Sequence, residues 1–130
     1  MLRNATVQGP SRPWLDEYIA RGYIPEMDYD HPVTNTVCRA AVTKTLEYAY
    51  DDWCIAQVAA KLGRSEDAAK LEKAAQNYRN VFDPETGFAR GRMSDGSWKP
   101  DPNLYDTHGQ GFIEGNSWNY SMYVPHDPDG

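Results

Sequence analysis

Two helical patterns joined by a short turn constrain the fold of this chain more than any other feature. In residues 41–62, apolar side chains recur every three or four positions, which is the spacing of one helix face. Gly63 follows as a stop, because glycine readily adopts the left-handed conformation that ends many helices. A similar pattern over residues 66–82 predicts a second helix. The predicted apolar positions are Val42, Leu46, Ala49, Trp53, Ala56 and Ala60 in the first helix, and Ala68, Leu71, Ala75, Tyr78 and Phe82 in the second.

The boundaries of the second helix are also marked. Ser65 is predicted to cap its start, where Glu66 and Asp67 favour the positively polarised end of the helix. Residues 83–87, Asp-Pro-Glu-Thr-Gly, end it. The prediction is an αα-hairpin over residues 41–82. Since two amphipathic helices alone have too little surface to cover each other's apolar faces, the hairpin is expected to belong to a larger helical fold.

The regions on either side of the hairpin are expected to be mostly irregular. Residues 1–40 contain several prolines and glycines and predict an irregular lead-in, with one helical turn in residues 13–22. Residues 83–112 predict a long loop, in which 87–92 and 96–100 are candidates for a small hairpin. Loops of this length are often functional. A third helix is expected to begin at 117–124, so the fold class is mainly α. The apolar side of the early turn comprises Trp14, Tyr18 and Ile19.

Composition narrows the choice of partners. The chain has 130 residues, which suits one domain, and its net charge of −6 leaves no basic patch for nucleic acid or anionic membrane. No apolar run approaches the ~20 residues that cross a membrane, and residues 1–20 lack the apolar core of a signal peptide. Nine Tyr, four Trp and three Phe fit stacking on a neutral ligand. We expect Cys38 and Cys54 to be buried thiols, with a disulfide as the alternative.

Acidic residues gather in the first predicted helix. Glu47, Asp51 and Asp52 lie within one helical turn or so, and Tyr48 and Tyr50 alternate with them. Like charges at this spacing repel each other unless a nearby cation, a bound proton or a hydroxyl group compensates for the negative charge. The cluster is therefore either a solvated helix face or a set of polar contacts to a sugar or a helix end.

Glu114 is the strongest catalytic candidate. It lies among Phe112, Ile113 and Trp118, and loss of solvation there would raise its pKa, as a general acid near neutral pH requires. The alternative is a capping acid at a helix start, for which the pKa would be lowered. Further along, His126 and Asp127 either orient an imidazole toward a ligand or form a structural hydrogen bond. Neither the histidines (His31, His108, His126) nor the acids Asp95, Asp101, Asp106, Asp127 and Asp129 have the spacing of a metal site, so no metal is expected to be held wholly within this chain.

Three long segments together resemble glycoside hydrolase family 92. They are residues 44–63 (KTLEYAYDDWCIAQVAAKLG), 74–98 (AAQNYRNVFDPETGFARGRMSDGSW) and 112–127 (FIEGNSWNYSMYVPHD), and WLDEYIARGYIP upstream is similar as well. The resemblance covers about residues 12–130. It implies an inverting, calcium-dependent exo-α-mannosidase, often specific for α-1,2 linkages, built on an (α/α)6 barrel after a β-sandwich domain. It also implies secretion or a periplasmic location.

The resemblance assigns roles to residues. It implies that Glu114 is the general acid and that Asn116, Trp118, His126 and Asp127 bind substrate. Asn119 stands where many members have Gln. The general base and the calcium ligands are expected downstream of this chain, so the chain is interpreted as a fragment of the catalytic domain that is inactive alone and self-associates through exposed helix faces. Its parts are the lead-in (1–40), the hairpin (41–82), the long loop (83–112) and the catalytic-acid motif (113–130). The alternative function is a non-catalytic helical interaction module or a sugar-binding module.

Overall fold

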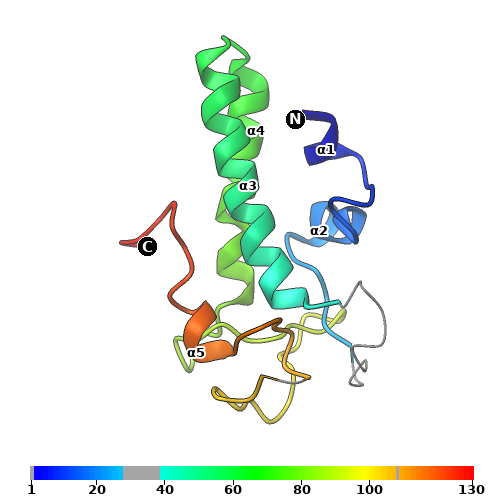
Figure 1. The fold of residues 1–130 in the computed structure, drawn as a ribbon, viewed down its shortest axis with the longest axis vertical. Helices are drawn as coiled ribbons and strands as arrows, with labels where there is room; N and C mark the ends of the chain where they lie inside the picture. Colours follow the sequence, from blue (N-terminus) through cyan, green and yellow to red (C-terminus); the bar gives the residue numbers. More distant parts are fainter. Residues whose placement is uncertain (1, 28–38, 108) are drawn as a thin grey trace.

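Two antiparallel helices, α3 (Ala41–Lys61) and α4 (Ser65–Ala75), lie side by side along the long axis of the molecule (Figure 1). They belong to a computed structural model that describes residues 2–27, 39–107 and 109–130. Gly63 lies between them with a φ of 73°, the left-handed conformation that a helix stop requires. The predicted αα-hairpin and its glycine stop are therefore confirmed.

The second helix differs from its prediction at both ends. Ser65 is its first helical residue, and Arg64 takes the capping position without a side-chain cap among the described residues. The prediction of a Ser65 cap is wrong because the chain enters the helix one residue earlier, where Arg64 forms an ion pair with Asp67 at 2.8 Å. After Ala75 the α-helix tightens into a 3-10 segment, η1 (Gln76–Val81), so the predicted single helix is two segments.

Helix α3 is buried on two sides, so the single apolar face that was predicted covers only part of its buried surface. Predicted positions such as Leu46 and Ala49 are buried, but Ala60 is exposed and Ala59 is buried in its place. One side packs on η1 and on Phe112. The other packs against the lead-in, where Leu15 and Tyr18 contact the helix. Polar residues on this second side are therefore buried too, namely Thr45, Tyr48 and Asp52.

The lead-in contains two short helices along one flank of the hairpin (Figure 1). Helix α2 (Leu15–Arg21) is the predicted helical turn, and Gly22 ends it with a φ of 76°. Tyr18 is buried as expected, whereas Ile19 is exposed, so only part of the predicted apolar side is correct. Helix α1 (Leu2–Thr6) was not predicted, since five residues are too few to show a period.

The long loop gathers at one end of the hairpin, beside helix α5 (Ser117–Tyr120) (Figure 1). Within the described residues it contains no strand. Its pairing is limited to isolated bridges, one of which joins Arg92 to Trp98, as expected for a small hairpin. Helix α5 has only four residues, so the third helix is shorter than predicted. In the described parts of the chain, no helix has the length and apolarity needed to cross a membrane.

Candidate active site

The loop before Glu114 is anchored on the start of α3. The residue before α3, Ala40, provides no capping side chain, which leaves the first N–H groups of the helix in need of acceptors. The backbone carbonyl of Gly111 accepts from the N–H groups of Val42 and Thr43 at 3.0 and 3.3 Å. Thr43 then accepts from the N–H of Ile113 through its Oγ1 at 3.2 Å. The loop therefore caps a helix that starts about 70 residues earlier in the chain.

Glu114 has an unusual backbone conformation. Its φ is 54°, in the left-handed region that non-glycine residues adopt at a cost of about 1–2 kcal/mol. The cap of α5 is Asn116, whose Oδ1 accepts from the N–H of Asn119 at 3.1 Å. The alternative of Glu114 as a capping acid is therefore wrong. Glu114 is also exposed, and so are Ile113 and Trp118. Within this chain the carboxyl group therefore stays in contact with solvent, contrary to the expected loss of solvation.

Two serines of the α5 segment bind the backbone of the long loop. The hydroxyl of Ser117 donates to the carbonyl of Ala89 at 2.5 Å, and Ser117 is only 4% exposed. The N–H of Ala89 donates to Oγ of Ser121 at 2.8 Å. The two side chains satisfy both backbone groups of Ala89, as a neighbouring strand would. The catalytic-acid motif is thus held by the loop as well as by α3.

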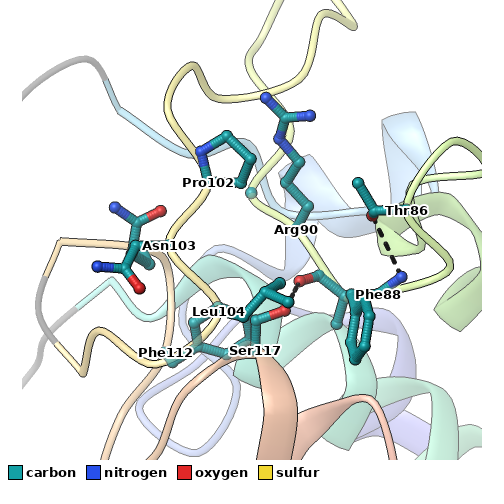
Figure 2. A pocket seen from close by; sticks show the side chains of 11 residues that line it. Thr86, Phe88, Arg90, Pro102, Asn103, Leu104, Phe112 and Ser117 are labelled. Atoms are coloured by element: carbon teal, nitrogen blue, oxygen red, sulfur yellow. Dashed lines mark hydrogen bonds between the residues drawn. The ribbon is translucent and has the colours of Figure 1, made fainter.

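A small cavity lies between these segments. Figure 2 shows Phe88, Leu104, Phe112 and Ser117 around it. Its volume is about 10 Å³, room for roughly one water molecule. No sugar ring fits in this cavity, but the outer surface of this loop is open to solvent.

Trp118 lies on that outer surface with its neighbours. It is 46% exposed, and its ring stacks with Phe88 and Tyr105 at centroid distances of 5.5 and 6.1 Å. Tyr105 is 71% exposed. Asn116 belongs to the same group, because its Nδ2 donates to the carbonyl of Tyr105 at 3.3 Å. The three rings cover part of each other's faces, and the exposed parts of Trp118 and Tyr105 leave aromatic surface open to solvent.

His126 and Asp127 each bind the hairpin. Asp127 accepts through Oδ2 from the hydroxyl of Tyr78 at 2.6 Å and from Arg79 at 2.9 Å. The hydrogen bond from Tyr78 lowers the pKa of Asp127, and the charge of Arg79 lowers it further. Burial and the same hydrogen bond raise the pKa of Tyr78 to about 12. The expected pairing of His126 with Asp127 is replaced by these contacts to η1.

The His126 ring lies among aromatic side chains. Its Nε2 is 2.9 Å from the carbonyl oxygen of Ala75, and a carbonyl can only accept, so Nε2 carries the hydrogen. Its ring contacts Tyr50, Trp53 and Tyr78 at centroid distances of 6.0, 6.2 and 5.5 Å. His126 and Asp127 thus fasten the end of the motif to the hairpin. His31 and His108 lie outside the described residues.

The acids of α3 divide into three roles. Asp52 is buried and forms an ion pair with Arg12 at 3.0 Å, while the Tyr18 hydroxyl donates to its other oxygen at 3.1 Å. Glu47 accepts from the hydroxyl of Tyr123 at 3.1 Å, and Asp51 is exposed. Asp52 is therefore neither on a solvated helix face nor free to contact a sugar or a helix end. It forms a structural ion pair with Arg12. Arg12 was missed because nothing near it in the sequence signals a partner 40 residues away.

The predicted site residues therefore form two groups. Glu114, Asn116 and Trp118 lie around α5, whereas His126 and Asp127 lie against η1. Among the described residues, no group of three His, Cys, Asp or Glu side chains is placed to hold a metal ion. Cys54 is a free, half-buried cysteine, and Cys38 lies outside the described residues. A row of ring contacts joins the two groups through Phe112, Tyr120, Tyr123, Tyr50 and His126, with centroids 5.5–6.5 Å apart.

Comparison with known proteins identifies similar sequences and structures. The sequence pattern of the glycosyl hydrolase family 92 catalytic domain matches residues 1–130. A solved structure of an inverting GH92 mannosidase from Bacteroides thetaiotaomicron VPI-5482 is 36% identical with a TM-score of 0.79, over 91% of this chain and 15% of that one. A GH92 alpha-mannosidase from Bacteroides thetaiotaomicron is 35% identical with a TM-score of 0.78, over 95% of this chain and 15% of that one. Among curated proteins, none matches.

A third structure shows the second of these mannosidases in complex with mannoimidazole. It is 38% identical to this chain with a TM-score of 0.72, over 85% of this chain and 14% of that one. The chain thus spans about 15% of the length of the structures that it matches. The likeness confirms the predicted fold class, which is mainly α with an αα-hairpin and long loops, resembling part of an (α/α)6 barrel.

Proposed function

We propose that this chain, which belongs to glycosyl hydrolase family 92, forms the part of an α-mannosidase catalytic domain that carries the general acid. The observation that carries the proposal is the family match, which spans residues 1–130. The similar structures are mannosidases, and one holds mannoimidazole, so the proposed substrate is a glycan with terminal α-linked mannose. An α-1,2 linkage and a secreted or periplasmic enzyme are part of the same proposal.

Glu114 is the proposed proton donor. Left-handed non-glycine residues persist where the surrounding structure holds them, and they cluster at active sites. Glu114 has this conformation, and its loop is bound to α3 through Gly111 and Thr43. In the proposed reaction its carboxyl group gives a proton to the glycosidic oxygen as the bond from that oxygen to the anomeric carbon breaks. The leaving sugar then departs as a neutral alcohol.

The second half of the reaction needs another carboxylate. An inverting glycosidase places its general base about 6.5–9.5 Å from the acid, where it removes a proton from the attacking water. We propose an inverting reaction whose base lies outside residues 1–130. Calcium is proposed for the whole enzyme, with ligands outside this chain as well. The described residues contain no group of three His, Cys, Asp or Glu side chains that would hold the ion.

Four further residues are proposed to bind substrate. Trp118, with Tyr105 stacked beside it, offers an exposed ring surface for a sugar. Asn116 forms the edge of this surface. His126 and Asp127 complete the set on the side of η1, where their hydrogen bonds to the hairpin leave the Asp127 side chain 27% exposed.

Hydrolysis of α-1,2-mannobiose tests the proposal. We expect no mannose release from the 130-residue chain, with or without calcium. In a longer polypeptide that contains this chain, Glu114→Gln is expected to lower kcat by about 10²–10⁴-fold, because a neutral amide cannot donate the proton. NMR of the first-formed anomer reports the stereochemistry, and β-mannose is expected.

Other outcomes would change the interpretation. Calcium-dependent release of β-mannose by the 130-residue chain, lost in Glu114→Gln, would show that residues 1–130 contain both carboxylates. Unchanged turnover of the longer polypeptide with Glu114→Gln would contradict the role of Glu114. Binding of mannobiose that changes tryptophan fluorescence, without turnover in any form, would instead favour the alternative of a sugar-binding module. The exposed rings of Trp118 and Tyr105 are the observation behind that alternative.

A further inference from the structure

Tyr120 contacts the backbone on both sides of Glu114. Its hydroxyl donates to the carbonyl of Ile113 at 2.8 Å, directly before Glu114. Its ring packs closely against Gly115, because a Cβ atom added there would lie only 2.9 Å from Cε2 of Tyr120. The ring also stacks on Phe112 with a centroid distance of 5.5 Å and an interplanar angle of 26°. One side chain thus touches three of the residues that surround the proposed acid.

Tyr120 is itself held in place. It is the last residue of α5, and its N–H donates to the carbonyl of Asn116 at 3.0 Å. The helix is fastened to the long loop through Ser117 and Ala89. The opposite side of the Glu114 loop is bound to α3 by Thr43. Residues 112–115 therefore lie between α3 and α5, and Tyr120 provides the contact with α5.

We infer that Tyr120 is a positioning residue, which keeps Glu114 in its left-handed conformation and so directs the carboxyl group. The inference rests on the proposed function of Glu114. A left-handed glutamate relaxes to an ordinary conformation unless its neighbours prevent it. The bond to the Ile113 carbonyl fixes the peptide group that precedes Glu114. On the other side of Glu114, the ring of Tyr120 packs against Gly115 and limits movement of the backbone there. Gly115 is accordingly a residue without a side chain.

The first test uses this chain and needs no activity. In Tyr120→Phe the ring remains and the hydroxyl is lost. We expect the NMR signals of Glu114 to move, with a three-bond HN–Hα coupling that no longer fits a φ near 54°. Gly115→Ala presses on the same ring from the other side and should move the same signals. Tyr123→Phe is the matched control, because its hydroxyl binds Glu47 at 3.1 Å instead of the loop. Glu114 signals that stay unchanged in both Tyr120→Phe and Gly115→Ala would overturn the inference.

The second test separates positioning from general folding. In a longer polypeptide that contains this chain, each variant is assayed on mannobiose, whose leaving group needs a proton, and on 2,4-dinitrophenyl α-mannoside, whose leaving group does not. Tyr120→Phe is expected to lower kcat on mannobiose about tenfold, the worth of one ordinary hydrogen bond, and to leave the second substrate nearly unchanged. Tyr123→Phe should show no such difference.

The outcomes distinguish the two proposals. If Glu114→Gln loses activity only on mannobiose while Tyr120→Phe behaves as the unmodified protein, the positioning role fails and the role of Glu114 stands. Equal losses on both substrates with Tyr120→Phe would indicate a purely structural role and would also overturn the inference. If Glu114→Gln shows no dependence on the leaving group, the proposed acid fails, and the role of Tyr120 fails with it.

Discussion

The α3–α4 hairpin and the loop region 83–127 are held together by different kinds of contact. In the hairpin, burial of small and aliphatic side chains dominates, with Leu46 at 1% exposure and Ala49 fully buried. In the loop region, side chains bind backbone groups directly. Ser117 and Ser121 bind Ala89, for example, at 2.5 and 2.8 Å. Apolar burial is non-directional and tolerates local change, whereas hydrogen bonds depend on particular atoms.

Arg90 illustrates how the loop is organised. Its guanidinium donates to Asp83 at 2.8 Å and, through two nitrogens, to the carbonyl of Lys99 at 2.8 and 2.6 Å. Burial alone would raise the pKa of Asp83, but the hydrogen bond and charge of Arg90, together with hydrogen bonds from the Glu85 N–H and Thr86, outweigh burial, and the pKa is lowered. The Arg90 side chain thus links Asp83, close to the end of η1, to Lys99 further along the loop. The loop without regular structure is nevertheless specifically ordered.

Removing apolar volume from the hairpin should have the largest effect. Leu46→Ala is expected to lower the free energy of unfolding by about 2–5 kcal/mol, because the cavity that remains cannot be filled. Urea denaturation followed by circular dichroism measures the loss. Leu62→Ala is the control. Leu62 is 72% exposed, so its truncation should change the free energy of unfolding by no more than about 0.5 kcal/mol. Similar losses for both variants would show that burial does not hold the hairpin as described.

Removing one hydroxyl from the loop region should have a smaller and more local effect. Ser117→Ala leaves the carbonyl of Ala89 without its buried donor, at a cost of about 1–3 kcal/mol. Hydrogen exchange should then increase around Ala89 and α5, while the amides of α3 keep their protection. Ser97→Ala is the control, because the hydroxyl of Ser97 is exposed and donates only to Asp95. If protection were lost evenly across α3 and the loop, the contrast between the two regions would be wrong.

Acid should weaken the contact between the end of the motif and η1, and this effect is the smallest. The folded pKa of Asp127 is lowered below its unfolded value of about 3.9. Its charged form therefore stabilises the fold above about pH 4, and that contribution is lost as the pH falls through the lowered pKa. We expect the urea midpoints of the unmodified chain and of Asp127→Asn to converge as the pH falls below about 4 and through the lowered pKa of Asp127. Asp129→Asn is the control, and parallel curves for Asp127→Asn would contradict the role of the carboxylate.

The hairpin could be predicted because its information is local. A three- and four-residue period predicts the helices, and a glycine between them predicts the turn, without reference to any distant residue. The same local reasoning failed at Ser65, where an ion pair of the preceding arginine replaced the expected cap. It also gave only part of the buried face of α3, because the lead-in covers a second side of that helix.

The residues of the candidate site are proposed from the sequence, whereas their geometry could not be predicted from it. The motif of residues 112–127 identified Glu114 and its neighbours through their resemblance to a family. Nothing in that stretch indicates that Glu114 is left-handed, or that Gly111 caps a helix from far along the chain. The different partners of His126 and Asp127 likewise depend on α4 and η1, which lie about 50 residues earlier in the chain.

The helical pair, its turn and the long loop could be predicted from the sequence, and the acid is the one that the family resemblance implies. Which polar groups meet depends on tertiary packing: Arg12 meets Asp52, Ser117 meets Ala89, and Tyr120 meets the backbone beside Glu114. The difference lies in how far apart in the chain the interacting residues are. A helix forms from contacts three or four residues apart, so its pattern is written locally. A hydrogen bond between distant segments depends on how the whole chain packs, and no local pattern encodes it.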